Sequence, residues 1–315
     1  MQNKNNDVSR GGNAPVSKSD ELKRFWRRNR TGWMFVLPLV IGLAVFTVYP
    51  MIQSLIWSFY NYTGNRLYYF VGFKNYIAIF TSDRTFWKVF GNTVFYAFVS
   101  VPLVLVSSYL LAVLVNQNLK CVGVFRVLYY LPVVIPGVVS GLLWKDIFSY
   151  NGLFNQLLGK VGLHSMFFDS GNPFVAIGSI FLMNMWGIGG GMILWLSAFK
   201  EIPSQLYEAA KIDGAGRFKQ FLHVTIPMSM PMIFFNVITM LIGTLQYNGT
   251  LVFAAGGRGE EDALYMFAVK IYNEAFVSSK YGYASALSWI LLLFVGLVTA
   301  LMFWIRKKVF NWEDT

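Results

Sequence analysis

Six long windows of this sequence contain no Asp, Glu, Lys or Arg, and this feature limits the possible folds most strongly. The windows are 31–65, 89–119, 127–144, 170–199, 220–257 and 281–305. A helix that crosses a bilayer needs about 20 predominantly apolar residues, and five of the windows are longer than that. The third is shorter, but Ile147 and Phe148 extend it past Lys145 and Asp146, whose charged tips can reach the interface. The sequence therefore predicts an all-α, polytopic membrane protein with six transmembrane helices, roughly at 33–58, 90–115, 127–148, 173–196, 228–252 and 284–305.

The charged residues are few and unevenly placed. They make up 13% of the chain, against about a quarter in soluble domains, which is too few to cover a soluble surface of this size. The net charge is +11, but eight of the 26 basic residues lie in the first 30 positions and the rest cluster between apolar runs. No RNA- or DNA-binding signature accompanies them, so the sequence argues against a nucleic-acid partner.

The distribution of Lys and Arg also predicts the orientation. With the N-terminus inside, the inner segments hold 17 basic residues and the outer segments nine, and basic residues favour the cytoplasmic side. Both termini are therefore expected in the cytoplasm. Residues 1–30 form a basic cytoplasmic tail, disordered over 1–20, and residues 31–315 form the membrane domain. Residues 21–30 fit either a membrane-surface anchor or a simple topology signal.

The loop between the fourth and fifth spans, 200–231, carries the most local information. Ser204 is a suitable N-cap, and the residues that follow it to Lys211 are mostly helix formers. The run Asp213-Gly214-Ala215-Gly216 ends that helix, a second basic helical stretch covers 217–223, and Pro227 begins the next span. The pattern predicts a short helix, a glycine turn and another helix on the inner membrane face. It carries no catalytic group and suits docking of another protein.

This loop resembles the EAA loop of the permease subunits of binding-protein-dependent ABC importers. The matching residues are Glu208-Ala209-Ala210, Gly214 four residues later, and Val224, Ile226 and Pro227. The run EAAKIDGAG is similar to the carbohydrate-uptake branch, and the resemblance implies the maltose-type, type I importer fold. It also implies that the coupling loop 200–227 seats in a cleft of a separate ATPase subunit. The residues given this role by resemblance are Leu206, Tyr207, Glu208, Ala209, Ala210, Asp213, Gly214 and Ala215.

Three further stretches resemble sugar permeases, so the likeness extends from about residue 30 onward. They are 71–76 with Phe86-Trp87 and Asn92-Thr93, then 125–136, then 281–289. One region departs from the family pattern, which often has an FD pair and then a TxGGP run after span five. Here Tyr247-Asn248 and Gly256-Gly257 are followed by Arg258 where the pattern has proline. Because the family is thought to handle substrate there, the departure bears on which substrate is carried.

Polar residues inside the spans are the candidates for a substrate pathway, because uncompensated polar groups are costly in a membrane. The amides and aromatic side chains that could contact a sugar are Asn184, Trp186, Asn236, Gln246, Tyr247, Asn248, Tyr283 and Trp289. A sugar has apolar C–H faces and a rim of hydroxyls, so aromatic platforms and amides suit it without charge. The amides could instead bond neighbouring helices. Gly187 and 189–191 fit close helix packing or a hinge, and the prolines in the spans fit ordinary kinks.

The resemblance implies a set of partners for the chain. These are a second, non-identical permease subunit, two cytoplasmic ABC ATPases, an external sugar-binding protein, a carbohydrate substrate and membrane lipid. No cofactor or metal is expected, and no GxxxxGK[ST] run is present, so ATP is expected to bind elsewhere.

An ion-coupled secondary transporter or a channel is the alternative function. Ion-coupled carriers usually place Asp, Glu or Arg within the membrane, and the six windows lack them. An intramembrane enzyme would need a base, a nucleophile or a metal. The two histidines, His164 and His223, fall in loops, so the chain is not expected to be an enzyme.

Overall fold

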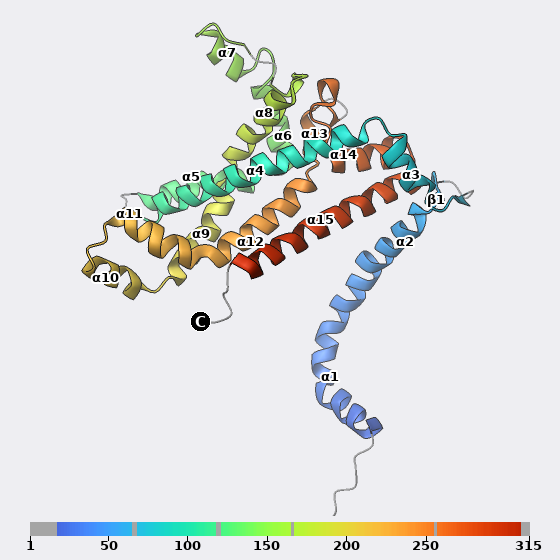
Figure 1. Ribbon diagram of the computed structural model, residues 1–315, viewed down its shortest axis with the longest axis horizontal. Helices are drawn as coiled ribbons and strands as arrows, with labels where there is room; N and C mark the ends of the chain where they lie inside the picture. Colours follow the sequence, from blue (N-terminus) through green and yellow to red (C-terminus); the bar gives the residue numbers. More distant parts are fainter. Residues whose placement is uncertain (1–17, 65–67, 118–120, 165–166, 255–256, 310–315) are drawn as a thin grey trace, which may run out of the picture. The chain divides into compact units, whose positions relative to one another are not determined.

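The structure is a computed structural model that describes residues 18–64, 68–117, 121–164, 167–254 and 257–309 (Figure 1). The chain divides into two compact units, Met1–Ile56 and Trp57–Thr315. Each unit is described below by itself.

The first unit consists of one long, apolar helical run. Helix α1 (Lys18–Leu43) continues through a π-helical segment (Ala44–Val48) into α2 (Tyr49–Ser58), whose last residues belong to the second unit. The large apolar side chains from Trp33 onward are mostly exposed, which suits a helix surrounded by lipid. Helix α1 begins inside the segment 1–20 for which disorder is expected, and the rest of that segment lies outside the described residues.

The second unit is built from helices, with one two-residue strand pair among its described residues. The strands β1 (Tyr60–Asn61) and β2 (Tyr69–Phe70) pair antiparallel, with Tyr60 opposite Phe70. The α-helices are α3 (Lys74–Thr81), α4 (Phe86–Val115), α5 (Val122–Val134), α6 (Gly137–Ile147), α7 (Leu153–Gly159), α8 (Pro173–Trp186), α9 (Gly189–Glu201), α10 (Ser204–Ile212), α11 (Arg217–Gln220), α12 (Ile226–Leu245), α13 (Thr250–Phe253), α14 (Phe267–Tyr272) and α15 (Tyr281–Val309). Short 3-10 turns cover Phe167–Asp169 and Glu260–Asp262, and π-helical segments cover Phe221–Thr225 and Asn273–Val277.

The described helices provide between four and six membrane spans. Four are long and apolar enough to cross by themselves: Thr31–Ser58, Phe86–Val115, Arg217–Phe253 and Tyr281–Lys308. Two further spans exist if each bent helix pair counts as one, namely α5 with α6, bent by 96°, and α8 with α9, bent by 53°. All six predicted windows therefore hold apolar helices, and the structure adds that the third and fourth are broken.

Local sequence explains the sharper break. Pro136 removes a backbone donor and disfavours the helical region for the residue before it. Ile135 is accordingly extended, with ψ at 128°, and Pro136 itself has ψ at 136° before α6 begins at Gly137. In the fourth span, α8 ends at Trp186, and Gly187 and Ile188 separate it from α9.

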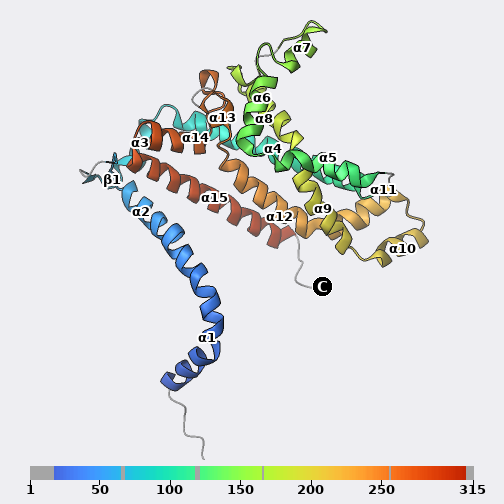
Figure 2. The ribbon, with the colours of Figure 1, turned by 180° about the vertical axis from the view of Figure 1, so that it is seen from behind.

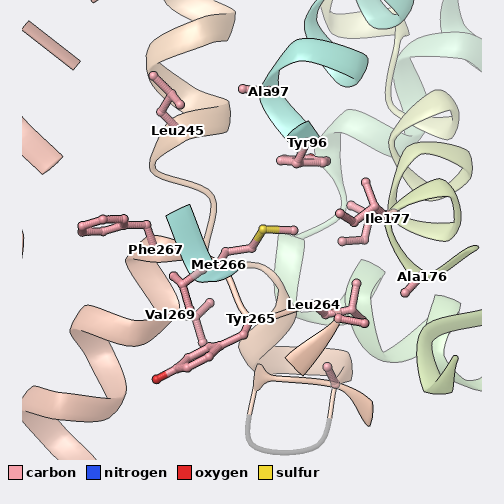
Figure 3. Packing of buried hydrophobic residues seen from close by; sticks show 14 of the residues in the cluster. Tyr96, Ala97, Ala176, Ile177, Leu245, Leu264, Tyr265, Met266, Phe267 and Val269 are labelled. Atoms are coloured by element: carbon pink, nitrogen blue, oxygen red, sulfur yellow. The ribbon is translucent and has the colours of Figure 1, made fainter. Parts of the chain in front are cut away.

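Two apolar clusters hold the second unit together, and they lie toward its two ends. In Figures 1 and 2 the α10 end, with α10 and α11, lies opposite the α3 end, with α3 and α14. Toward the α3 end, Tyr96 and Ile177 pack with Leu264, Met266 and Phe267 (Figure 3). Toward the α10 end the buried residues are Tyr109, Leu111, Ala112, Val115, Met192, Trp195, Leu196, Phe199 and Ile202.

Candidate functional site

A cavity of about 690 Å³ lies beside the first of these clusters, which shares Tyr96 and Phe253 with its wall, and is lined by both broken spans. Helix α4, the α5–α6 break, the end of α8 and the region from α12 to α13 each contribute to its wall. The lining residues are Tyr96, Ser100, Val101, Val104, Pro132, Gly137, Val138, Ser140, Gly141, Met183, Asn184, Trp186, Gly187, Met240, Gly243, Thr244, Tyr247, Asn248, Gly249, Val252 and Phe253. Because several spans contribute, a shift of any one of them changes the shape of the cavity.

A hydrogen bond between two helices lies in the wall of this cavity. Asn184 on α8 donates from Nδ2 to the Tyr96 hydroxyl on α4 at 2.7 Å. The Tyr96 ring lies 4.9 Å, centroid to centroid, from the Tyr247 ring just beyond α12. Three spans thus meet at one patch that contains an amide and two tyrosine rings.

Tyr247 is positioned by its glycine neighbour. A side chain at Gly249 would place its Cβ only 2.5 Å from the Tyr247 hydroxyl oxygen. The chain can therefore turn under the ring only because position 249 has no Cβ. Within the described part of the chain the Tyr247 hydroxyl is buried and has no hydrogen-bond partner, which is costly in an apolar environment.

The wall is mostly apolar, with interspersed polar groups and no charged side chain among its described residues. None of its described residues is Asp, Glu, Lys, Arg or His. Amide, hydroxyl and phenol groups are interspersed with Trp186 and with apolar side chains, and Trp186 lies 6.0 Å from Trp144, centroid to centroid. Such a surface can hydrogen-bond hydroxyl groups and cover apolar C–H faces. It offers neither a charged group for ion coupling nor the acid–base pair that hydrolysis needs.

The structure brings four of the eight candidate pathway residues together at this cavity: Asn184, Trp186, Tyr247 and Asn248. The other four lie elsewhere. Asn236 is buried in α12 and donates to the Met232 carbonyl of its own helix at 2.9 Å, and Gln246 is exposed. Tyr283 and Trp289 lie on α15, away from the lining, and Tyr283 donates to Asp83 at 2.6 Å. Arg258, which departs from the family pattern, also lies outside the lining and pairs with Asp262 at 2.6 Å.

Reasoning from the sequence missed several polar lining residues, among them Tyr96, Ser100, Ser140 and Thr244. They lie in charge-free windows, so the rule that polar groups in spans are costly applies to them as well. Tyr96 was the most detectable, because it is a large polar residue in the middle of an apolar helix.

The second predicted site, the loop 200–227, folds as a helix, a turn and a helix. Helix α10 ends in a Schellman motif, in which the Ala215 N–H donates to the Ala210 carbonyl at 2.8 Å and the Gly214 N–H to the Lys211 carbonyl at 3.0 Å. Gly214 has φ at +75°, a conformation that favours glycine. The expected N-cap needs one correction: Ser204 is the first residue of α10, and Pro203 occupies the cap position with extended backbone.

The predicted coupling residues divide between the exposed and the inner side of this motif. Leu206, Glu208, Ala209, Asp213 and Gly214 are exposed, whereas Ala210 and Ala215 are half-buried. Tyr207 faces inward, and its hydroxyl lies 3.0 Å from the Thr225 Oγ1. This contact joins α10 to the helical run that leads into α12.

Two apolar side chains beside the turn extend this surface. Ile212 is 87% exposed and Phe218 is 72% exposed. Neither was predicted, although each is an apolar residue within a charged loop, which is a signal visible in the sequence. Exposed apolar side chains grouped around a rigid turn are typical of a protein–protein contact.

The fold and the cavity together are those of a polytopic membrane protein: apolar helices line a cavity without charged side chains among its described residues, and a structured loop projects beside them. Comparison with known proteins specifies the class further. The family described as binding-protein-dependent transport system inner membrane component matches residues 76–311. The chain belongs to this family, and is thus a multi-pass protein of the cytoplasmic membrane.

Individual relatives agree with this assignment. The probable ABC transporter permease protein YesP of Bacillus subtilis is 34% identical over 87% of this chain and 90% of its own length. The lactose transport system permease protein LacF of Rhizobium radiobacter is also 34% identical, over 94% of this chain and 99% of its own length. A chain in the crystal structure of a bacterial ABC transporter involved in the import of the acidic polysaccharide alginate shares the fold. It is 20% identical, with a TM-score of 0.82 over 92% of this chain and 100% of that chain.

Proposed function

We propose that this chain is one of two permease subunits of an ATP-driven importer for an uncharged sugar, and that α10 transmits the movement of a separate ATPase. The uncharged, amide- and phenol-bearing cavity between broken spans is the observation that carries the proposal. A sugar ring needs hydroxyl partners and flat apolar faces, and the wall offers both. The names of relatives such as LacF, a lactose transport permease, support a carbohydrate cargo.

The proposed path requires partners on both sides of the membrane. An external binding protein delivers the sugar, and a second, non-identical permease chain completes the cavity wall. One solved structure with this fold is a bacterial alginate ABC transporter in complex with a periplasmic protein bound to an alginate pentasaccharide, which supports such a delivery partner. Two ATPase subunits close on ATP at the cytoplasmic side and push the α10 end, which alternates access to the cavity.

The exposed surface of α10 supports the coupling step. Small residues at Ala209 and Gly214 allow close approach, and the exposed apolar side chain of Ile212 offers an anchor. The Tyr207–Thr225 contact then links a docked partner to α12, which lines the cavity. A push at α10 would thus reach the substrate site through a continuous chain of contacts.

Affinity purification of the tagged chain from its own membrane tests this proposal. We expect an ATP-hydrolysing subunit to co-purify, and we expect Ile212→Glu and Gly214→Arg to reduce its recovery by about tenfold or more, because a charge or a long side chain enters the docked surface. Leu153→Glu, which places the same charge at an exposed apolar position of α7, is the matched control and should leave recovery unchanged.

Two results would contradict the proposal. If both α10 variants retained the ATPase and transported sugar normally, α10 would have no coupling role. If the purified chain alone moved a solute down an ion gradient without ATP, the secondary-transporter alternative would be correct.

A further inference from the structure

The segment 257–267, here called the cap segment, has an irregular backbone. Gly257, Gly259, Glu261 and Asp262 all have positive φ, between 48° and 72°. A short 3-10 turn, Glu260–Asp262, interrupts the irregular path before α14. A segment of this kind lacks the repeated hydrogen bonds of a helix, so its position depends on the side chains that hold it.

Helix α4 supplies several of those side chains. The Asn92 amide lies 2.9–3.3 Å from the carbonyl oxygens of Asp262, Ala263 and Tyr265. The Phe267 N–H donates to the Thr93 Oγ1 at 2.8 Å, and Lys88 donates to the Glu261 carbonyl. These contacts dock the cap segment on α4.

A buried ion pair extends the attachment just beyond the cap segment. Lys270 on α14 lies 2.8 Å from Asp83, between Nζ and Oδ2, and the two side chains are only 3% and 10% exposed. The Thr85 hydroxyl donates to Asp83 at 2.9 Å and accepts from Lys270 at 2.8 Å. Tyr283 on α15 donates to the same carboxylate, and Glu274 lies 3.9 Å from the Lys270 Nζ.

This cluster ties three parts of the bundle together: the α3–α4 connection, α14 and the start of α15. Among the described residues, Lys270 is the only buried Lys, Arg, Asp or Glu. Burial raises the pKa of Asp83, but the hydrogen bonds from Lys270 and Tyr283 and the positive charge outweigh it and hold the pKa at about 2. The carboxylate is therefore charged at neutral pH.

The cap segment also touches the wall of the cavity. Leu264 and Met266 are fully buried in the same apolar cluster as Tyr96 and Phe253, and both of the latter line the cavity. Figure 3 shows Met266 and Leu264 beside the part of the cluster that includes Tyr96 and Ile177. Movement of the cap segment would therefore separate Leu264 and Met266 from the apolar cluster that lies between the cavity and the α3 end.

We propose that the Asp83–Lys270 pair is a latch that holds the cap segment against the cavity wall in the resting subunit and breaks when the cavity opens at the α3 end. This inference rests on the proposed function, in which that end faces outward. The spans cannot separate there while one buried pair bridges α14, α15 and the start of α4. Breaking such a pair is costly, so the closed state is favoured until partner subunits drive opening.

Thiol labelling of the complete transporter in membrane vesicles tests the latch. In a background with Cys121→Ser, which removes the single cysteine, Met266→Cys reports whether the cap segment is accessible to a membrane-impermeant maleimide. We expect Asp83→Asn to raise the resting labelling rate by about tenfold or more, because it leaves a buried ammonium group without its main partner. Lys270→Met should raise it less, since Asp83 keeps Thr85 and Tyr283.

Matched variants separate the latch from general damage. Asp83→Glu keeps the carboxylate and should stay within about threefold of the parent. Arg258→Gln removes an ion pair inside the cap segment whose arginine is 44% exposed, and it should have no effect. A cysteine at Ile180, which is buried in the same cluster outside the cap segment, should stay protected in Asp83→Asn.

Three outcomes would decide the matter. Equal resting labelling rates of Met266→Cys in Asp83→Asn and in the parent would overturn the latch. In Asp83→Asn, labelling of Ile180→Cys as fast as Met266→Cys would also overturn it, because the helix bundle would then have loosened as a whole. Trapping with ATP and vanadate should expose Met266→Cys in the parent. If ATP changes nothing while Asp83→Asn still exposes the cysteine, the latch stands and the ATP-driven importer function fails.

Discussion

Two asparagines in apolar helices have similar chemistry but different surroundings. Asn184 lines the cavity and donates to Tyr96 on another helix, whereas Asn236 is buried and satisfies the Met232 carbonyl of its own helix. Asn236 is only 3% exposed and does not line the cavity, so a solute there would not reach its amide. One asparagine therefore belongs to the cavity wall, and the other to the interior of α12.

Substitution of these two residues tests that distinction. Asn184→Ala should raise the half-saturating sugar concentration by about tenfold, which corresponds to one hydrogen bond. Asn236→Ala should leave it unchanged, because that side chain does not line the cavity. Transport measured over a range of sugar concentrations gives both values. An equal shift in the two variants would show that the substrate does not bind at the proposed cavity wall.

The broken spans decide the shape of the site at the scale of elements. Residues at the ends of α5 and α8 and at the start of α6 face the cavity, because the chain turns there instead of continuing straight. Irregular backbone is tolerated at membrane depth where it lines a cavity. The break therefore makes room for the cavity beside α5 and α6.

A proline substitution tests the α5–α6 break. Pro136→Ala restores a backbone donor and lets Ile135 become helical, so α5 should extend toward α6 and narrow the cavity. We expect the transport rate to fall several-fold while the chain still inserts and associates with its partners.

Pro102→Ala is the matched control, because Pro102 lies inside α4, which continues without a break from Phe86 to Val115. Initial uptake rates at equal protein amounts compare the two. A rate loss as large in Pro102→Ala as in Pro136→Ala would show that the break itself is not needed.

At the scale of the whole molecule, the two ends of the second unit differ in chemistry. The α10 end carries an exposed helix–turn–helix motif, and the α3 end carries the cap segment and the ion pair beside it. Helix α15 runs between Tyr281, near that ion pair, and Val309. The excess of basic residues in the predicted inner segments predicts that the α10 end lies in the cytoplasm.

Single cysteines at the two ends of α15 test this orientation. In the Cys121→Ser background, Ser279→Cys should react with an impermeant maleimide in intact cells, and Lys307→Cys should react only after permeabilisation. Both positions are exposed in the structure, so burial does not confuse the readout. The reverse pattern would invert the topology and remove α10 from the side where ATP is hydrolysed.

The sequence predicted the spans and the loop 200–227 because the signals for both are local. Absence of charge over about 20 residues defines an apolar helix wherever it packs, and Gly214 with its neighbours defines the end of α10 by backbone conformation alone. The resemblance of Glu208-Ala209-Ala210 and Gly214 to the EAA loop likewise sits in one short stretch.

What only the tertiary structure decided is which polar residues meet. Tyr96 and Asn184 lie 88 positions apart in the chain, and Lys270 and Thr85 lie 185 apart. Each pair forms because two helices pack with a particular rotation about their axes, and composition does not encode that rotation. The sequence by itself therefore determined that this chain enters the membrane as apolar helices and carries the helix–turn–helix loop 200–227. The packing of those helices decided which amides and phenols line the cavity, and which carboxylate holds the only buried lysine of the described residues.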